Sequence, residues 1–350
     1  MRIAQVAPLV EAVPPRLYGG TERVVSWLTE ELVELGHDVT LFAAGDSRTK
    51  AELVACAPAG LRIAGIHDHL GYHLAMLERV RRCEAQFDII HFHIDLLPFA
   101  MFGHLTDKCL VTLHGRLDLP DFWPAYEAFA GMPLVSISDS QRLPLPPGPS
   151  FLATIPHGFR PQTIPLGAGD GGYLAFLGRI CPEKRPDRAI EIAVAAGLPL
   201  KIAAKVDPVD TIYFEERIKP LLRHPLVEFI GEISDAQKAQ FLGRALALLF
   251  PIDWPEPFGL VMIEAMAAGT PVIAWRNGSV PEVLRGGVSG LIVESVEEAV
   301  RAVPQALRLD RAAVRRAFEQ RFSARRMAQN YISAYERLLR GGSALSIAAE

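Results

Sequence analysis

The most informative part of this chain is the stretch Phe250–Ala274, FPIDWPEPFGLVMIEAMAAGTPVIA, which predicts a helix between two apolar strands. Proline and glycine residues surround Glu256 and indicate a loop, whereas Glu264 falls two turns into the apolar run that begins near Phe258. The sequence therefore predicts one carboxylate in a loop and a second one on the helix that follows.

The start of this helix suits a phosphate group, because the first backbone N–H groups of a helix are unpaired and lie at the positive end of its dipole. The amides near Phe258, Gly259 and Leu260 are the candidates, and Gly259 permits a close approach. Carboxylates accept hydrogen bonds from sugar hydroxyls and repel phosphate. A sugar nucleotide, with a diphosphate between two sugars, matches this arrangement.

Glu264 has a simpler explanation, as a solvated residue on an amphipathic helix, which would suffice for an isolated pair of glutamates. Its neighbours, Leu-Val-Met-Ile before it and Ala-Met-Ala-Ala-Gly after it, are apolar or small on every side. Because an unpaired buried carboxylate is costly, we predict a ligand as the partner of Glu264.

With these residues the chain resembles glycosyltransferase family 4, a large retaining family of the GT-B fold whose signature is Glu-x7-Glu followed by Ala-Met-Ala-x-Gly-x-Pro-Val-Ile. The resemblance implies that Glu256 contacts hydroxyls of the transferred sugar and that Glu264 binds the ribose. It also implies that the amides of Phe258, Gly259 and Leu260 bind the distal phosphate.

A second element is Tyr173–Lys184, YLAFLGRICPEK, an apolar strand that ends in a Gly-Arg turn. Arg179 and Lys184 suit a diphosphate, since Arg binds it bidentately and Lys adds a point charge. The alternative is a pair of surface cations near Glu183 and Asp187.

This element resembles the Gly-Arg-(x)4-Lys motif of the family, which implies that Arg179 and Lys184 hold the diphosphate. The sequence departs from the motif at Arg185, where the family often has glycine, and the departure puts the shape of the turn in doubt.

Composition agrees with a soluble enzyme of 350 residues, half of them hydrophobic, with a formal net charge of −4. Nucleic acid is therefore not an expected partner. The four cysteines show no Cys-x-x-Cys spacing and Met1–Val6 is typical of a strand, so we expect a cytoplasmic protein. No apolar run approaches the ~20 residues of a membrane span, so membrane contact would be peripheral. The basic segment 311–326 is either the surface that contacts anionic lipid or a solvated helix face.

Strands and helices alternate along the chain, which predicts an α/β fold with two Rossmann-like domains. We expect an acceptor domain at residues 1–165 and a donor domain at 166–309. By resemblance to the GT-B fold, the helices at 310–340 return to the first domain, and the two domains face each other across a cleft. In the first domain the predicted strands are Arg2–Ala7, Asp38–Ala44, Ile89–His93, Lys108–Leu113 and Leu134–Ser138, with a helix at Thr21–Leu35.

Two further donor-site candidates lie in the first domain. Gly19 and Gly20 precede Thr21, a predicted N-cap, and the matching loop of the family closes over the donor; alternatively the pair merely turns the chain. His114 follows a predicted strand and matches a Thr-x-His element of the family whose histidine lies by the transferred sugar. We therefore predict His114 as a donor-site or catalytic residue.

Other side chains are candidates for metal, base and acceptor binding. His91 and His93 alternate on a predicted strand, yet the family needs no metal, so we expect none, and no cofactor. Ile233 is the candidate beside the base. Acceptor candidates are His69, His93, Asp95 and the aromatic residues Tyr18, Phe122, Trp123 and Tyr126, which serve equally well as core residues.

By resemblance, the predicted reaction is metal-independent transfer of a hexose with retention, from a nucleotide-diphosphate sugar to an unidentified hydroxyl acceptor. UDP-glucose is the expected donor, ahead of GDP-mannose and an ADP-sugar. The alternatives are a GT-B epimerase or phosphorylase and a non-catalytic nucleotide-sugar sensor.

Overall fold

The computed structural model describes residues 1–16 and 19–347, so Tyr18 lies outside the described residues. The chain divides into two compact units. The first comprises Met1–Arg160 and the chain from Ala324 onward, and the second is Pro161–Ser323.

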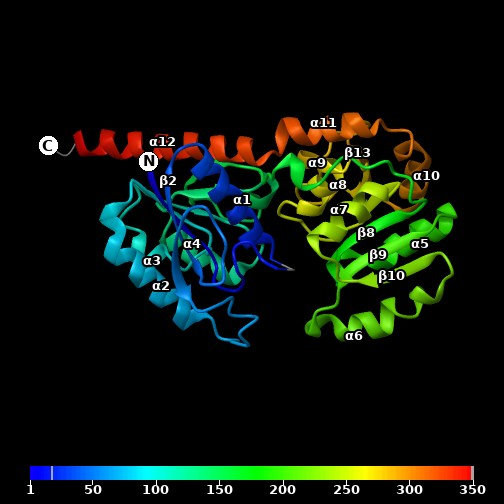
Figure 1. The fold of residues 1–350 in the computed structure, drawn as a ribbon, viewed down its shortest axis with the longest axis horizontal. Coiled ribbons are helices and arrows are strands. Elements are labelled where there is room, and N and C mark those ends of the chain that lie inside the picture. Colours follow the sequence, from blue (N-terminus) through cyan, green and yellow to red (C-terminus); the bar gives the residue numbers. More distant parts are fainter. Residues whose placement is uncertain (17–18, 348–350) are drawn as a thin grey trace. The chain divides into compact units, whose positions relative to one another are not determined.

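In its described part, the first unit holds a parallel seven-stranded sheet with the order β3-β2-β1-β4-β5-β6-β7 (Figure 1). Its central strands are covered on both faces, which suits apolar residues; all residues of β4 and β5 are buried. The strands are β1 (Arg2–Val6), β2 (Asp38–Ala44), β3 (Glu52–Ala57), β4 (Ile89–Phe92), β5 (Cys109–Thr112), β6 (Leu134–Ser136) and β7 (Phe151–Thr154). The α-helices are α1 (Gly20–Glu34), α2 (Leu70–Cys83), α3 (Phe99–Phe102), α4 (Trp123–Ala128) and α12 (Ala324–Ile347).

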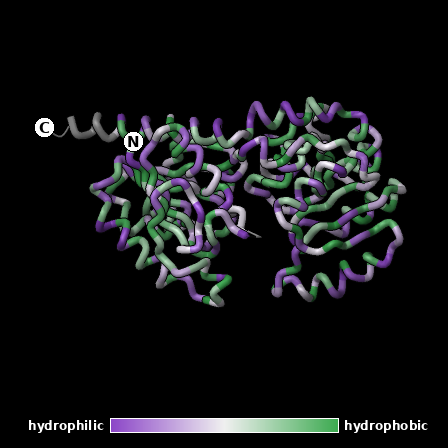
Figure 2. The backbone as a smooth tube through the Cα atoms, in the orientation of Figure 1, coloured by the Kyte–Doolittle hydropathy of each residue, from purple (hydrophilic) through white to green (hydrophobic). Residues whose placement is uncertain are grey.

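The second unit, described throughout, holds a parallel six-stranded sheet with the order β10-β9-β8-β11-β12-β13. Its strands are β8 (Leu174–Arg179), β9 (Leu200–Lys205), β10 (Val227–Gly231), β11 (Ala247–Phe250), β12 (Val272–Trp275) and β13 (Gly290–Val293). The α-helices are α5 (Pro186–Ala196), α6 (Thr211–Tyr213), α7 (Asp235–Arg244), α8 (Leu260–Ala267), α9 (Val280–Val283), α10 (Val296–Ala306) and α11 (Arg311–Arg321). The fully buried strands β4, β5, β11 and β12 are apolar along most of their length, whereas hydrophilic residues are frequent on α11 (Figure 2).

Strand order reverses once in each sheet, between β1 and β4 in the first unit and between β8 and β11 in the second. Loops that leave the carboxyl ends of two such neighbouring strands run in opposite directions and leave a crevice, which is where parallel sheets bind ligands. Arg179 ends β8, and the loop that carries Glu256 follows β11. The segments Tyr173–Lys184 and Phe250–Ala274 therefore meet at the switch point of the second sheet.

The observed division differs from the expected one at both ends of the second unit. The border follows Arg160 rather than residue 165, and the chain returns to the first unit at Ala324 rather than at residue 310. Helix α11 packs against α8 inside the second unit, because its arginines bind backbone carbonyls there. Arg311 donates to the carbonyls of Gly167, Gly243, Ala245 and Ala268, and Arg315 to those of Pro161, Ile164 and Ala267. The guanidinium groups of Arg311 and Arg315 thus bind backbone carbonyls of the second unit, which leaves them engaged in the fold and not available to contact lipid.

Candidate functional site

The loop between β11 and α8 is shaped by glycines. Gly259 caps α8 with φ +79°, in the left-handed region that favours glycine, and an added Cβ would lie 2.8 Å from Cε of Met262. Gly278 also has a positive φ of 54°, and its Cβ would overlap the backbone N and O of Glu256. Ser279 donates its N–H to the carbonyl of Glu256 at 3.0 Å. Gly278 was missed from the sequence, although Asn-Gly-Ser is a turn signature.

Lys184 and Glu256, which the sequence placed on the diphosphate and on the sugar, are joined directly. The ammonium of Lys184, at the end of the 3-10 turn Pro182–Lys184, donates to Oε2 of Glu256, and both side chains are largely buried, 18% and 12% exposed. Trp254 donates its indole N–H to the same oxygen at 2.9 Å. The Lys184 nitrogen also lies 5.1 Å from the centre of the Trp254 ring, where the ring face stabilises the cation. A cation and a carboxylate are thereby fixed at the carboxyl end of the sheet.

Arg179, at the end of β8, contacts different acids from those of Lys184. Its guanidinium lies 3.3 Å from Asp207 and 3.8 Å from Asp210, both in the segment that follows β9. Lys205 binds Asp207 at 2.6 Å. The structure thus confirms Arg179 at the strand end and gives it two carboxylate neighbours that the sequence reasoning had not included.

Glu264 is buried, as expected, but its partner is a protein side chain. Nζ of Lys238, on α7, donates to Oε1 of Glu264 at 2.7 Å, and the two side chains are 16% and 8% exposed. The buried carboxylate therefore has a protein partner that the sequence did not indicate, and the prediction that Glu264 also binds a ligand stays a prediction. Lys238 carries no sequence signal beyond its place on an amphipathic helix, because only tertiary packing brings α7 beside α8. One oxygen of the carboxylate is engaged, and a carboxylate has acceptor capacity on both.

Arg185, where the family motif often has glycine, adopts a backbone conformation that favours glycine. Its backbone lies in the left-handed region, with φ 52° and ψ 54°. Its guanidinium binds Asp187 at 2.8 Å and Asp253 at 2.9 Å, and these carboxylates, Asp187 first, raise its pKa. Because an L-residue in this region is disfavoured by roughly 1–2 kcal/mol, we attribute its retention to these ion pairs, which tie the β8–α5 turn to the β11–α8 loop.

Ile233 and the aromatic candidates lie in varied surroundings. Ile233 is half-buried in the connection from β10 to α7, the helix that carries Lys238. Tyr126 is buried in the core against Phe99, at 5.9 Å between ring centres, and Trp123 donates its indole N–H to the carbonyl of Leu117. Of the described aromatic candidates, Phe122 is exposed at the surface.

In the first unit, α1 begins at Gly20 with Gly19 as its N-cap, so the prediction of Thr21 as the cap was wrong. The first turn carries Glu22, which is buried, and burial raises the pKa of its carboxyl. An added Cβ on Gly19 would lie 2.7 Å from Cβ of Pro15, so this position accommodates only glycine without movement.

His114 follows β5, at the carboxyl end of the first sheet. Its Nε2 lies 2.8 Å from Nδ1 of His93, and its ring stacks on that of His157 with 5.2 Å between centres. Burial lowers the pKa of His114 to about 3, so the ring is neutral at physiological pH. His91 and His93 also bind neighbouring side chains. Asp95, just beyond β4, has an exposed side chain and a φ of 48°, and His69 binds the carbonyl of Ile66.

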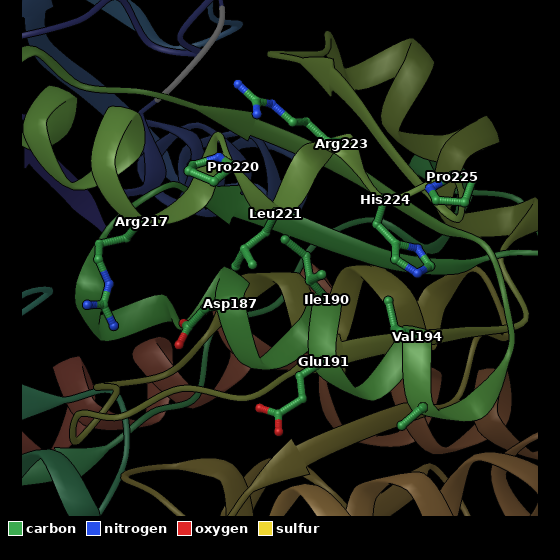
Figure 3. Close-up of a pocket in the computed structure, with 11 residues that line it drawn as sticks. Asp187, Ile190, Glu191, Val194, Arg217, Pro220, Leu221, Arg223, His224 and Pro225 are labelled. Atoms are coloured by element: carbon green, nitrogen blue, oxygen red, sulfur yellow. The ribbon is translucent and has the colours of Figure 1, made fainter.

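A cavity of about 860 Å³ lies away from these residues, between α5 and the segment 217–225 (Figure 3). Ile190, Val194 and Leu221 line its middle, and Arg217 and Glu191 stand at its edge. Apart from Asp187, which binds Arg185, it shares no residue with the candidate site in the described structure.

Comparison with known proteins gives consistent matches in both units. The family model "Glycosyl transferases group 1" matches residues 165–321, and "Glycosyltransferase Family 4" matches residues 18–136. A phosphatidyl-myo-inositol mannosyltransferase of Mycobacterium leprae (strain TN) is 28% identical over 336 residues, 86% of each chain. A D-inositol 3-phosphate glycosyltransferase of Mycobacterium leprae (strain Br4923) is 32% identical over 41% of this chain and 37% of its own.

Solved structures resemble the chain over nearly its whole length. AviGT4, a glycosyltransferase involved in avilamycin A biosynthesis, is 25% identical with a TM-score of 0.73, covering 97% of this chain and 98% of its own. Sucrose-phosphate synthase from Thermosynechococcus elongatus is 18% identical with a TM-score of 0.79, covering 97% and 100%. The expectation of two Rossmann-like domains in a GT-B fold is confirmed. Among the described residues, no helix combines the length and apolarity of a membrane span.

Proposed function

The chain belongs to glycosyltransferase family 4, and from this premise we propose that it transfers a hexose, with retention, from a nucleoside diphosphate sugar to a hydroxyl acceptor. The donor we propose is UDP-glucose. GDP-mannose is the competing donor, because the phosphatidyl-myo-inositol relatives that span most of the chain are mannosyltransferases. The observation that carries the proposal is the largely buried Lys184–Glu256 pair at the switch point of a parallel sheet, with the buried Glu264 on the helix that follows.

In this proposal each group of the second unit meets a different part of the donor. The ammonium of Lys184 and the guanidinium of Arg179 stabilise the charge that develops on the departing diphosphate. Glu256 accepts a hydroxyl hydrogen of the hexose, and Glu264 accepts ribose hydroxyls with its oxygen not engaged by Lys238. Phe258, Gly259 and Leu260 bring backbone N–H groups to the distal phosphate.

The proposed reaction is a front-face substitution. The bond from the anomeric carbon to the phosphate oxygen breaks, the bond to the acceptor oxygen forms on the same face, and the acceptor proton passes to the departing diphosphate. We propose no metal in this step, since the cations of Arg179 and Lys184 supply the positive charge. We further propose a cytoplasmic reaction, with which the four free thiols agree, and peripheral contact where the acceptor is a lipid.

The first test is calorimetric binding of UDP, GDP, ADP and NAD in EDTA, followed by the matching sugar nucleotides. We expect one nucleoside diphosphate to bind, and Glu264→Ala to abolish the binding. Glu215→Ala is the matched control, because it breaks an exposed Lys–Glu pair of the same unit, 2.6 Å from Lys219, away from the site. Binding of NAD alone, or of none of these ligands, would overturn the proposal.

Turnover separates transfer from the alternatives. Product formation with an added hydroxyl acceptor, starting with myo-inositol and its phosphate because the curated relatives act on inositol compounds, supports transfer. Donor cleavage or isomerisation that needs no such acceptor indicates a phosphorylase or an epimerase. Tight donor binding without turnover across the acceptor set indicates a sensor.

A further inference from the structure

A layer of polar side chains lies between the central strands of the first sheet and α12. Residues two apart on a strand share a face, and residues four apart share a helix face, so this layer follows from spacing. All of its members other than half-buried His114 are no more than 2% exposed. They are Gln5 of β1, His91 and His93 of the β4 segment, Thr112 and His114 of the β5 segment, and Tyr331 and Tyr335 of α12.

Hydrogen bonds connect these side chains into one continuous series that ends at His114. Oε1 of Gln5 lies 2.8 Å from Nε2 of His93, and Nδ1 of His93 lies 2.8 Å from Nε2 of His114. In the other direction, Nε2 of Gln5 donates to the hydroxyl of Tyr335 at 3.2 Å. That hydroxyl lies 2.8 Å from Nδ1 of His91.

The other end of this series of hydrogen bonds also reaches α12, through Tyr331. Nε2 of His91 lies 2.7 Å from Oγ1 of Thr112, which in turn lies 2.9 Å from the hydroxyl of Tyr331. Burial lowers the pKa values of His91 and His93 well below the ordinary range, so both rings are neutral and each carries a single proton.

The amide of Gln5 decides where those protons lie. Its carbonyl oxygen can only accept, so His93 carries its proton on Nε2 and accepts at Nδ1. The bond between the two rings then needs a proton on Nε2 of His114. Nδ1 of His114 is consequently a bare acceptor, and this buried atom has no hydrogen-bond partner among the described residues.

We propose that Gln5, held by Tyr335 and acting through His93, is a positioning residue that fixes His114 in the Nε2–H tautomer, so that Nδ1 accepts a hydroxyl of the bound sugar. The sugar as ligand rests on the proposed function, whereas the tautomer does not. The class of group recognised is a hydroxyl donor, because a bare imidazole nitrogen accepts a hydrogen bond and repels a phosphate oxygen.

The opposite arrangement is also self-consistent, which makes the proposal testable. If the Gln5 amide is turned over, every proton in the chain reverses and His114 carries its proton on Nδ1 as a donor. The orientation of an amide is assigned from its hydrogen bonds. In the structure, the amide nitrogen faces Tyr335 and the oxygen faces His93, which selects the first arrangement.

The test is the tautomer of His114 in the full-length protein, labelled with ¹⁵N histidine and measured by long-range ¹H–¹⁵N correlation near neutral pH. We expect a protonated Nε2 and a bare Nδ1 in His114, and the same pattern in His93. A protonated Nδ1 in His114 of the wild type would overturn the proposal, whether or not the protein transfers a sugar.

Two tyrosines one helical turn apart provide a matched pair of variants. Tyr335→Phe removes the hydroxyl that holds the Gln5 amide, so His114 should become a mixture of tautomers. Tyr331→Phe removes a hydroxyl of an equally buried ring that does not contact Gln5, and should leave the tautomer unchanged. In the Tyr335→Phe background, Gln5→Glu should restore the Nε2–H form, because a carboxylate accepts from His93 in either orientation. Equal effects of both tyrosine variants would contradict the positioning role.

Kinetics then separate this inference from the proposed function. Once a donor is identified by the binding screen, Tyr335→Phe should lower kcat/KM roughly threefold to tenfold, as expected for one lost hydrogen bond, with nucleoside diphosphate affinity unchanged. The expected tautomers without sugar transfer would refute the proposed function alone. Sugar transfer with the reversed tautomer would refute the positioning role alone.

Discussion

Lowering the pH from about 7.5 to about 5.5 is expected to destabilise the first unit much more than the second. Nine of the ten histidines lie in the first unit, and His224 alone lies in the second. His91, His93 and His157 are 0%, 2% and 4% exposed, and burial lowers the pKa of each well below its ordinary value. The folded state therefore excludes protons that the unfolded chain binds, so stability present above the unfolded pKa is lost as the pH falls.

The size of this stability loss depends on the histidine pKa values of the unfolded chain. In the folded protein the pKa values of these three histidines lie well below their ordinary value, so the rings stay neutral over this pH range. A histidine of ordinary pKa about 6.5 that stays neutral in the fold loses ~1.4 kcal/mol between about pH 7.5 and about pH 5.5. Three such side chains lose ~4 kcal/mol together, a large share of a typical stability of about 5–15 kcal/mol. Glu22 offsets part of this loss, since desolvation raises the pKa of its buried carboxyl.

The assay is native-state hydrogen exchange followed by mass spectrometry on the full chain, comparing peptides from β1, β4 and β5 with peptides from β8, β11 and β12. Opening free energies in the first group should fall by at least ~3 kcal/mol over this pH range, while the second group changes little. His91→Gln should reduce the acid loss of the first group by ~1.4 kcal/mol, whatever its effect on absolute stability. Equal acid sensitivity in the two units, or a loss below ~1 kcal/mol in the first, would refute the reasoning.

Three further predictions concern the second unit. Lys238→Met leaves the buried carboxylate of Glu264 unpaired and should lower the free energy of unfolding, measured in urea, by ~3–5 kcal/mol. The double variant with Glu264→Leu should regain most of that free energy. A double variant as unstable as the single one would contradict the explanation by a paired charge. Gly278→Ala should weaken nucleotide binding in calorimetry by displacing the loop backbone, whereas Gly197→Ala, at φ 66° with no atom within 4 Å of the added Cβ, should leave binding unchanged. Lys184→Ala should lower turnover on the order of 100-fold, with a much smaller change in unfolding free energy, and a proportionate loss of both would count against its role.

Local sequence determined much of the candidate site. The apolar run from Phe258 fixed α8, and Gly259 was visible as a glycine at the start of that helix. Its left-handed backbone and the contact that an added Cβ would make with Met262 appear only in the structure. The periodicity also predicted the central strands, β2 to the residue and β1, β4, β5 and β6 within one or two residues of each end. These strands are covered on both faces, so their apolar runs are continuous. The edge strand β7, half-buried throughout, lacks that signal and was missed.

Tertiary structure alone decided how the charges are paired. Lys238 reaches Glu264 because α7 and α8 pack side by side, and no periodicity along the chain encodes that contact. Arg185 keeps a left-handed backbone conformation because Asp187, in the first turn of α5, and Asp253, in the loop after β11, both bind its guanidinium. Likewise, the two-residue spacing of His91 and His93 was visible in the sequence. Their proton arrangement follows from Gln5 and Tyr335, 330 positions apart, which only the folded sheet and its returning helix bring together.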